Sequence, residues 1–248
     1  MQIGIDVGAT KIESVVLEQN GQEKHRSRTS CPKDYLSIIN AIKDISQKLE
    51  KEFKMELPIG VCHPGIHSPQ TGLVKNAPNC YWLEKKPFQN DLRKALGKEV
   101  FCENDANCFA LSEAYDGSAQ HYKIVFGIIL GSGCGGGLII DKKILVGPNA
   151  FAGEWGHVPI GLSNSKNNIE QFISGKGLER LYFSRFKKKL IAKDIFKLAR
   201  NNSINEKKFV DEFLDKLGLG LAYIINIIDP DAIVFGGGVS NEIESLEK

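Results

Sequence analysis

The first half of the chain alternates short apolar segments with one long amphipathic stretch. The short segments are typical of strands, and they are Ile3–Val7, Ile12–Leu17, Glu23–Thr29, Leu57–Cys62 and Val100–Cys102. From Tyr35 to Phe53 apolar residues recur every three or four positions, which predicts an amphipathic helix of several turns. Shorter helices are expected over Phe88–Leu96 and Asn104–Tyr115, with Asn104 capping the second. This half therefore reads as one α/β unit.

A similar order of elements begins again near residue 124. Ile124–Leu130 is an apolar strand that runs into the glycine-rich stretch Gly131–Gly137. The elements expected after it are a hairpin over Leu138–Asp141 and Ile144–Val146, helices over Ile169–Phe183, Lys189–Arg200 and Glu206–Ile228, and a strand over Ala232–Phe235. The repeated strand, glycine turn and hairpin predict two related α/β lobes, residues 1–117 and 118–248, with a cleft between them.

Composition and charge narrow the class of protein. The 248 residues are 42% hydrophobic and 25% charged, as in ordinary soluble globular proteins. The net charge of +2, from 32 basic and 30 acidic residues, argues against nucleic acid and anionic membranes as partners. The N-terminus has no signal-peptide pattern, and no apolar run approaches the length of a membrane span. The six scattered cysteines include no CxxC pair, so reduced thiols in a cytoplasmic protein are expected.

Asp6–Lys11, between the first two expected strands, is a candidate phosphate-binding turn. Gly8 permits a positive φ, so backbone N–H groups of the turn can face phosphate oxygens, and the Thr10 hydroxyl can donate to one. Asp6 could hold Mg²⁺ through water, because Mg²⁺ keeps several of its waters in proteins. An ordinary hairpin with an aspartate at its first corner explains the same residues.

Gly131–Gly137 is the stronger candidate, since five of its seven residues are glycine. A structural role explains such a stretch poorly, because glycine forfeits chain entropy and packs weakly, whereas close approach of a polyphosphate explains it well. No Lys-Ser/Thr follows, which excludes a Walker A loop, and no helix follows, which excludes a Rossmann fingerprint. Gly236-Gly237-Gly238 is a third glycine turn, where adenine or ribose could lie against backbone; a plain strand-to-helix turn is the alternative.

Two polar clusters are candidates for an acceptor site. Asp105 lies near the N-terminus of an expected helix, and its carboxylate could accept the proton of a hydroxyl that attacks a phosphoryl group. Helix capping by Asn104 with an acidic first turn is the alternative. Glu154 and His157 are three residues apart and could bind neighbouring sugar hydroxyls. A metal site at His157 would need further ligands, and residues 158–169 contain no Cys, His, Asp or Glu.

Taken in order along the chain, these motifs resemble the ROK family of sugar kinases. The resembling segments, between Met1 and about Asn241, are Asp6–Lys11, Glu103–Cys108, Leu130–Gly137, Ala152–His157 and Asp229–Ser240. The resemblance implies a two-lobed actin-like ATPase (ribonuclease H-like) fold with an interlobe cleft that closes. It also implies Mg·ATP as the phosphoryl donor and, often, a homodimer.

The resemblance assigns roles to individual residues as well. Asp105 would be the general base. The sugar would contact Gly65, Asn104, Glu154, His157 and Glu170, and ATP would contact Asp6, Gly8, Ala9, Thr10, Lys11, Gly131, Ser132, Gly133, Gly236, Gly237 and Gly238. Asp6 would also hold Mg²⁺, through water.

Phe88, Asp91-Leu92 and Val74–Ala77 are most similar to the bacterial fructokinase branch of the family. The resemblance therefore implies ATP-dependent phosphorylation of a hexose, with fructose expected, at a primary hydroxyl. N-acetylglucosamine and glucose kinases share most of these residues, and a sugar- or nucleotide-binding relic without catalysis is the non-enzymatic alternative. A DNA-binding repressor of the family is disfavoured, since repressors carry a helix-turn-helix domain before the first phosphate motif, which begins here at Asp6.

The chain departs from the family pattern in two places. Many relatives carry a cysteine-rich zinc loop between the positions of His157 and Glu170, whereas Ser163–Asn168 contains no cysteine, so no structural zinc is expected. The family also continues for several dozen residues past the position of Lys248, with a helix that returns to the first lobe. Without the zinc loop, we expect packing alone to orient His157 and Glu170.

Overall fold

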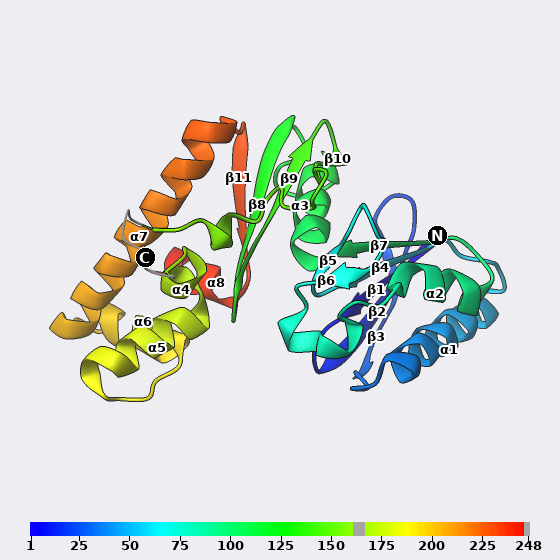
Figure 1. The fold of residues 1–248 in the computed structure, drawn as a ribbon, viewed down its shortest axis with the longest axis horizontal. Coiled ribbons are helices and arrows are strands. Elements are labelled where there is room, and N and C mark those ends of the chain that lie inside the picture. Colours follow the sequence, from blue (N-terminus) through cyan, green and yellow to red (C-terminus); the bar gives the residue numbers. More distant parts are fainter. Residues whose placement is uncertain (161–166, 246–248) are drawn as a thin grey trace. The chain divides into compact units, whose positions relative to one another are not determined.

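The computed structural model describes residues 1–160 and 167–245 (Figure 1). The chain forms two compact units, Met1–Cys108 with Gly147–Ala150 and Phe109–Val146 with Phe151–Lys248. It passes from the first unit to the second inside helix α3 (Asp105–Tyr115), whereas the sequence pattern placed a lobe boundary near Gly117. Among the described residues, none of the helices has the length and apolar character that crossing a bilayer demands.

The first unit is built on a mixed sheet with the strand order β3-β2-β1-β4-β7. Its strands are β1 (Gln2–Val7), β2 (Lys11–Leu17), β3 (Glu23–Ser30), β4 (Ile59–His63) and β7 (Val100–Asn104). β2 pairs antiparallel with β1 and β3, while β1, β4 and β7 run parallel. Alternate residues of β1 are buried, namely Ile3, Ile5 and Val7, as expected for a strand with one face on a core. The strands predicted for this half are thereby confirmed.

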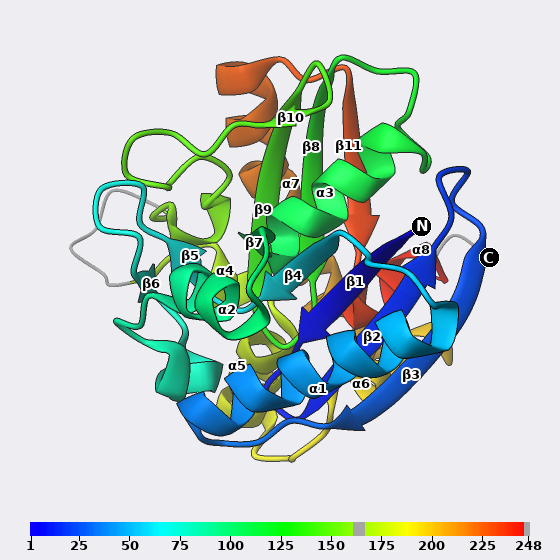
Figure 2. The same cartoon turned by 90° about the vertical axis from the view of Figure 1, so that its right-hand side faces the viewer.

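Helices α1 (Tyr35–Phe53) and α2 (Phe88–Leu96) pack on this sheet (Figure 2). α1 buries Ile38, Ile42 and Leu49 along one stripe, in the same core as the strand side chains. Burying each such side chain stabilises the fold by roughly 1.5–3 kcal/mol. The helix begins after Asp34, whose carboxylate accepts a hydrogen bond from the Ser37 backbone N–H at 2.9 Å.

Between β4 and α2, a small ribbon positions the turn at Gly65. β5 (Ile66–His67) pairs with β6 (Val74–Lys75), and the 3-10 helix η1 (Pro78–Leu83) follows. Gly65 has a φ of 87°, and a Cβ there would lie 2.8 Å from the Ala77 Cβ and 2.9 Å from the Lys75 carbonyl oxygen. Only glycine fits both this conformation and this space. Sequence periodicity did not predict β5 and β6, because two residues are too few to show a period.

The second unit has a sheet with the strand order β10-β9-β8-β11. Its strands are β8 (Ile124–Leu130), β9 (Cys134–Ile140), β10 (Lys143–Ile144) and β11 (Ala232–Gly236). The helical segments that follow β10 are η2 (Trp155–His157), α4 (Glu170–Ile173), α5 (Gly175–Phe186), α6 (Ala192–Arg200), α7 (Ile204–Ile228) and α8 (Gly238–Glu244). Ala110 and Ala114 of α3 pack with Val125 on one face of the sheet. Helices α4 to α8 cover the other face, where Phe126 and Ile128 are buried (Figure 1).

Strand β9 begins earlier than the sequence pattern predicted. Cys134 already pairs with Leu130, so Gly135–Gly137 lie within the strand rather than in a turn. A Cβ on Gly136 would lie 2.5 Å from the Gly153 carbonyl oxygen, so these glycines admit a neighbouring segment against the sheet. We expected a structural role to explain the run Gly131–Gly137 poorly. This expectation is wrong for Gly135–Gly137, which lie within β9.

The helix expected over Ile169–Phe183 is in fact two helices, α4 and α5. Ser174 has an extended backbone, and its hydroxyl accepts a hydrogen bond from the Gly177 N–H at 3.1 Å, so this residue ends α4 and caps α5. α6 begins at Ala192 rather than Lys189, and α7 begins at Ile204 rather than Glu206. Helix ends depend on caps and local packing, which apolar periodicity does not report.

Candidate active site

Three predicted site segments of the first unit gather at one edge of its sheet. β1, β4 and β7 are parallel neighbours, and Asp6, Cys62 and Glu103 occupy one row across them. Each strand ends one residue after that row, so the turn after Asp6, the Gly65 turn and Asp105 all follow at the carboxyl edge. This edge of parallel strands is where open α/β sheets bind their ligands.

Asp105 opens α3, and its own helix holds its carboxylate. Oδ1 accepts a hydrogen bond from the Ala106 backbone N–H at 2.9 Å. Asn104 is buried, and its Oδ1 accepts from the Asn107 N–H at 2.8 Å, which confirms it as a helix cap. The backbone of Asp105 is thereby fixed, while its side chain remains exposed.

The surroundings of the two carboxylates disfavour their charged forms. Loss of hydration raises the pKa of Asp105 above its ordinary value of 3.8, and the charge of Asp6 adds to this rise. Loss of hydration also raises the pKa of Asp6; the hydrogen bond with Cys62 opposes the rise and the charge of Glu13 adds to it. Both residues are exposed by surface area, so protein atoms around the carboxylates reduce their hydration only in part.

This charge distribution fits a hard cation such as Mg²⁺ at Asp6. Carboxylate oxygens are ligands that Mg²⁺ prefers, and a cation would offset the repulsion between Asp6 and Asp105. Among residues 1–160 and 167–245, no three His, Cys, Asp or Glu side chains form a group that could hold a metal. In phosphate sites Mg²⁺ keeps several of its waters, and it could be held at Asp6 in the same way.

The turn after Asp6 is closed by its own hydrogen bonds. The Gly8 N–H donates to the Lys11 carbonyl at 2.8 Å, and the Cys31 N–H donates to the Thr10 carbonyl at 2.9 Å. The Gly8 N–H is thus less available to a phosphate than the sequence pattern indicated. The side chains of Thr10 and Lys11 are exposed, and they are the groups that this turn presents.

The glycine turn of the second unit rests on the N-terminus of α5. The Gly175 N–H donates to the Gly131 carbonyl at 2.8 Å, and the Lys176 N–H donates to the Ser132 carbonyl at 3.3 Å. A Cβ on Gly131 would meet no atom within 4 Å, so the backbone is open on that side, as a phosphate-binding turn requires. Lys176 adds an exposed cation beside this turn.

The predicted sugar-binding residues of the second unit lie on adjoining segments. His157 Nδ1 is 3.1 Å from Glu154 Oε2. The segment of Glu170 pairs with the one after His157, because the Ile169 N–H donates to the Val158 carbonyl at 3.0 Å. Carboxylates accept hydrogen bonds and imidazole both accepts and donates, so the set suits vicinal sugar hydroxyls.

Of the three glycines where β11 ends, Gly236–Gly238, two are sterically required by the fold. Gly237 has a φ of 92°, and a Cβ there would lie 2.4 Å from the Leu130 carbonyl oxygen. A Cβ on Gly236 would lie 2.7 Å from the ring of Phe109. The Cβ position of Gly238 has no atom within 4 Å, so of the three predicted adenosine contacts Gly238 has the open surface.

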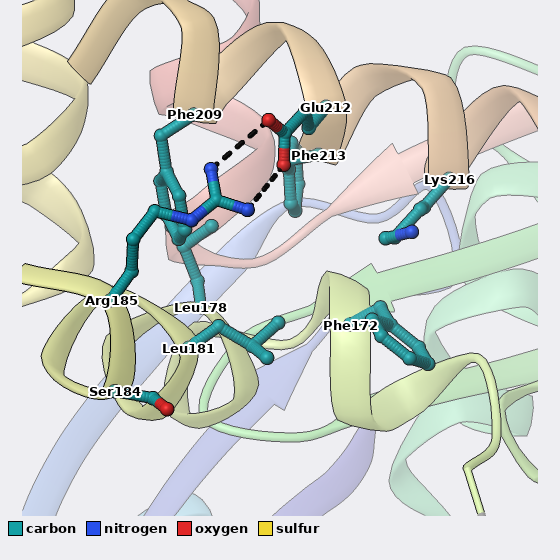
Figure 3. A pocket seen from close by; sticks show the side chains of 9 residues that line it. All are labelled: Phe172, Leu178, Leu181, Ser184, Arg185, Phe209, Glu212, Phe213 and Lys216. Atoms are coloured by element: carbon teal, nitrogen blue, oxygen red, sulfur yellow. Dashed lines mark hydrogen bonds and ion pairs between the residues drawn. The ribbon is translucent and has the colours of Figure 1, made fainter. Parts of the chain in front are cut away.

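A pocket of about 480 Å³ lies elsewhere in the second unit, between α4, α5 and α7 (Figure 3). Arg185 and Glu212 pair across its rim at 2.6 Å, and the Lys216 Nζ lies 4.8 Å from the centre of the Phe172 ring. Its lining consists of Phe172, Leu178, Leu181, Ser184, Arg185, Phe209, Glu212, Phe213 and Lys216. None of these is a predicted site residue, so this pocket does not mark the predicted chemistry.

The structure thus assembles the predicted residues into one group in each unit. The sequence analysis did not identify Lys176. The helix cap at Ser174 was the available signal, because it marks the start of the helix that carries Lys176. His63 and His67 were also missed; their ring centres are 4.7 Å apart, and they flank the Gly65 turn. Strand alternation through β4 could have marked His63 as an inward-facing residue.

The expected absence of structural zinc concerns Ser163–Asn168, of which residues 163–166 lie outside the described residues. It stays a prediction.

Comparison with known proteins identifies the family. Residues 2–248 match the model of the ROK family. The N-acetyl-D-glucosamine kinase of Histophilus somni (strain 129Pt) is 35% identical over 259 residues, covering 97% of this chain and 85% of that protein. The ROK hexokinase from Thermus thermophilus has a similar structure, with a TM-score of 0.88, 27% identity, and coverage of 99% of this chain and 86% of that one.

A ROK family glucokinase from Streptomyces griseus, solved in complex with glucose and AMPPNP, is also similar. Its TM-score is 0.77 at 28% identity, and the match covers 97% of this chain and 84% of that one. The expected actin-like ATPase fold is confirmed by these neighbours.

The curated relatives also bear on the branch of the family. Those from Histophilus somni and Haemophilus influenzae, at 35% and 36% identity, are named N-acetyl-D-glucosamine kinases. The fructokinase branch indicated by Phe88 and Val74–Ala77 is therefore not confirmed, and the N-acetylglucosamine alternative is better supported. Because the family model and these relatives match nearly the whole chain, the chain belongs to the ROK family.

Proposed function

We propose that this chain transfers the γ-phosphoryl group of ATP to a primary hydroxyl of a hexose, with N-acetyl-D-glucosamine as the first candidate. As a family member with these relatives, the chain is an ATP-dependent sugar kinase. The observation that carries the proposal is the exposed carboxylate of Asp105 at the carboxyl edge of the first sheet, beside Asn104 and in one group with Asp6. The names of the relatives support the choice of sugar.

Asp105 accepts the proton of the attacking hydroxyl in this proposal. The cap at Asn104 sets its backbone, and the Ala106 N–H aligns its carboxylate. A raised pKa strengthens a carboxylate as a base, because proton affinity grows with pKa. A positioned general base of this kind contributes about 10²–10⁴-fold to a rate.

Each unit has a turn whose groups suit a phosphate. The first unit offers the Thr10 hydroxyl and the Lys11 ammonium, and the second offers open backbone at Gly131 with Lys176 beside it. Donors and cations fixed in advance stabilise the charge that the phosphates carry during transfer. Mg²⁺ held through water by Asp6 would neutralise part of that charge when bound.

Glu154, His157 and Glu170 of the second unit offer side chains for sugar hydroxyls, and Asn104 of the first unit has the same role by the family resemblance. A site built to hydrogen-bond a hydroxyl rejects an analogue that lacks it, because its own polar groups are then left unpaired. N-acetyl-D-glucosamine and glucose differ at C2, where the first carries an acetamido group. Selectivity at C2 is therefore what distinguishes the candidate substrates.

The test is ADP release from Mg·ATP with N-acetyl-D-glucosamine, glucose and fructose in parallel. We expect saturable turnover, with the highest kcat/KM for N-acetyl-D-glucosamine. A higher value for fructose would move the assignment to the fructokinase branch that Phe88 and Val74–Ala77 favour. Sugar binding in a calorimeter without ADP release would indicate a binding relic, and no response to any hexose would overturn the proposal.

A further inference from the structure

The pocket between α4, α5 and α7 has no role in the proposed reaction, but its size and lining suit a ligand (Figure 3). Its volume of about 480 Å³ is within the range of about 300–1,000 Å³ that is typical of small-molecule sites. Leu178, Phe209 and Phe213 line it and are buried, at 1%, 4% and 3% exposure. All of its lining residues belong to the second unit.

Aromatic rings make up much of the apolar lining. Phe172 comes from α4, and Phe209 and Phe213 come from α7. Aromatic pairs in edge-to-face or offset contact are favoured beyond the apolar area that they bury. A ligand with a flat aromatic body therefore gains more from this lining than an aliphatic one of the same size.

The charges at the pocket are unbalanced. Arg185 and Glu212 offset each other, because two guanidinium nitrogens donate to the two carboxylate oxygens at 3.0 and 2.6 Å. The Lys216 Nζ lies 4.8 Å from the centre of the Phe172 ring, and no ion pair joins it to a carboxylate among residues 1–160 and 167–245. The hydrogen bonds from Arg185 lower the pKa of Glu212, and the charges of Lys208 and Lys216 lower it further against a partial loss of hydration. The surplus of positive charge favours an anion.

We propose that this pocket binds a small aromatic carboxylate. The ring packs among Phe172, Phe209 and Phe213, and the carboxylate accepts a hydrogen bond from the Lys216 ammonium. Hydrogen bonds between charged groups are about twice as strong as those between neutral ones, so the carboxylate adds both affinity and selectivity. This binding does not depend on the proposed function.

Helix α4 links the pocket to a predicted sugar contact. Glu170 opens α4, and Phe172 follows two residues later. A Cβ on Gly133 would lie 3.6 Å from the Glu170 Oε1, so this carboxylate lies beside the glycine turn. A helix of four residues is marginal on its own, so contacts with its neighbours fix its position.

A ligand packed against Phe172 adds such contacts and thereby holds Glu170 in place. When a binding residue is ordered in advance, the ligand that it contacts binds more tightly, because less freedom is lost on binding. We therefore expect an occupied pocket to lower the KM for the sugar and to leave kcat nearly unchanged. This second part rests on the proposed function.

The first test is a ligand-observed NMR titration of the full chain with 2-naphthoate and, in parallel, with its neutral amide, 2-naphthamide. We expect saturable binding of 2-naphthoate with a Kd of roughly 0.1–1 mM. The amide should bind at least about threefold more weakly, because it lacks the charge that Lys216 favours. Absence of saturable binding, or equal affinity for the two compounds, overturns the site.

Four variants locate the binding. Ser184→Trp fills the pocket from an exposed position and should remove it. Lys216→Gln should weaken 2-naphthoate at least about threefold, whereas Glu212→Gln should tighten it, because the cations then lack their carboxylate. Lys207→Gln, an exposed lysine on the same helix outside the pocket, is the matched control and should change nothing. Thermal unfolding verifies that each variant is folded, and unchanged affinity in Ser184→Trp and Lys216→Gln overturns the site.

The second test is ADP release at varied N-acetyl-D-glucosamine, with and without 2-naphthoate. We expect a KM at least about twofold lower with 2-naphthoate, and by linkage the sugar should tighten 2-naphthoate binding in the NMR titration. If neither changes, the link through α4 is wrong, although the site stands. A chain that phosphorylates no sugar contradicts the proposed function alone, since the titration still decides for or against the pocket.

Discussion

Asp105 is held where its charged form is disfavoured, although its side chain reaches solvent. Loss of hydration and the charge of Asp6 raise its pKa. A carboxyl with a raised pKa in the folded chain takes up a proton more readily than in the unfolded chain, so the folded state loses stability as the pH rises through that range. Residues that oppose stability in this way are characteristic of functional sites.

Replacing Asp105 by asparagine should separate chemistry from binding. Asp105→Asn removes the proton acceptor but keeps the shape, so we expect turnover to fall by about 10²–10⁴-fold while sugar affinity changes little. Thermal stability at neutral pH should be equal or higher, because a disfavoured charge is gone. ADP release, calorimetry and thermal unfolding measure the three effects.

Asp116→Asn, just after the same helix and exposed, is the matched control and should keep the normal rate. Turnover of Asp105→Asn at that rate would show that another group is the base.

His63 should make stability depend on pH below neutrality. The residue is fully buried, and burial together with His67 lowers its pKa from 6.5 to about 4. The unfolded chain therefore binds a proton between those values while the folded chain does not, so stability falls as the pH drops from 6.5 toward 4. The full shift corresponds to about 3 kcal/mol.

Urea unfolding at a series of pH values measures this effect. His63→Leu should flatten the slope, whereas the exposed His121→Asn should leave it unchanged. An unaltered slope in His63→Leu would mean that another group, such as His67, carries the pH dependence.

At the scale of elements, the glycines of β9 and of the turn before it have different functions. A Cβ on Gly136 would lie 2.5 Å from the Gly153 carbonyl oxygen, whereas a Cβ on Gly131 would meet no atom within 4 Å. The first glycine allows η2 to approach the sheet, and the second leaves an open surface. One motif thus contains residues needed for folding and residues available for a ligand.

Alanine at these two positions should give opposite results. Gly136→Ala forces the segment near Gly153 to move, so we expect roughly 1–3 kcal/mol of lost stability in urea unfolding. Gly131→Ala should fold normally but bind an ATP analogue at least several-fold more weakly, because the methyl group enters the open surface. Normal ATP affinity in Gly131→Ala would exclude this turn as a phosphate site.

The elements also show where sequence patterns reach their limit. Periodicity located α1, because Ile38, Ile42 and Leu49 form one continuous stripe. It merged α4 and α5, because the break at Ser174 is a change of backbone direction that leaves the apolar spacing intact. Periodicity extended the glycine turn to Gly137, whereas β9 already begins at Cys134. Glycines within a strand have no side chains whose alternation could show the period.

For the whole chain, ligand binding should be visible as metal-dependent thermal stabilisation. An ATP analogue with Mg²⁺ at a hundred times its Kd should add about 2.7 kcal/mol, which raises the Tm of a chain of this size by roughly 5–10 °C. Chelation of Mg²⁺ should remove most of that shift, because the carboxylates of Asp6 and Asp105 would then face uncompensated phosphate charge. Equal shifts with and without Mg²⁺ would argue against a metal at Asp6.

Local sequence patterns were enough to indicate the family, the α/β class and most of the candidate residues. Strand alternation, helical periodicity and short motifs such as Glu103–Cys108 are local properties, so they can be recognised without coordinates. The folded chain was needed to show which glycines are sterically required and which, like Gly131 and Gly238, face open space. The fold also places Asp6, Cys62 and Glu103 in one row of the sheet, since strand register joins residues that are far apart along the chain. Steric room and contact depend on what the folded chain brings alongside a residue, and no local pattern contains that information.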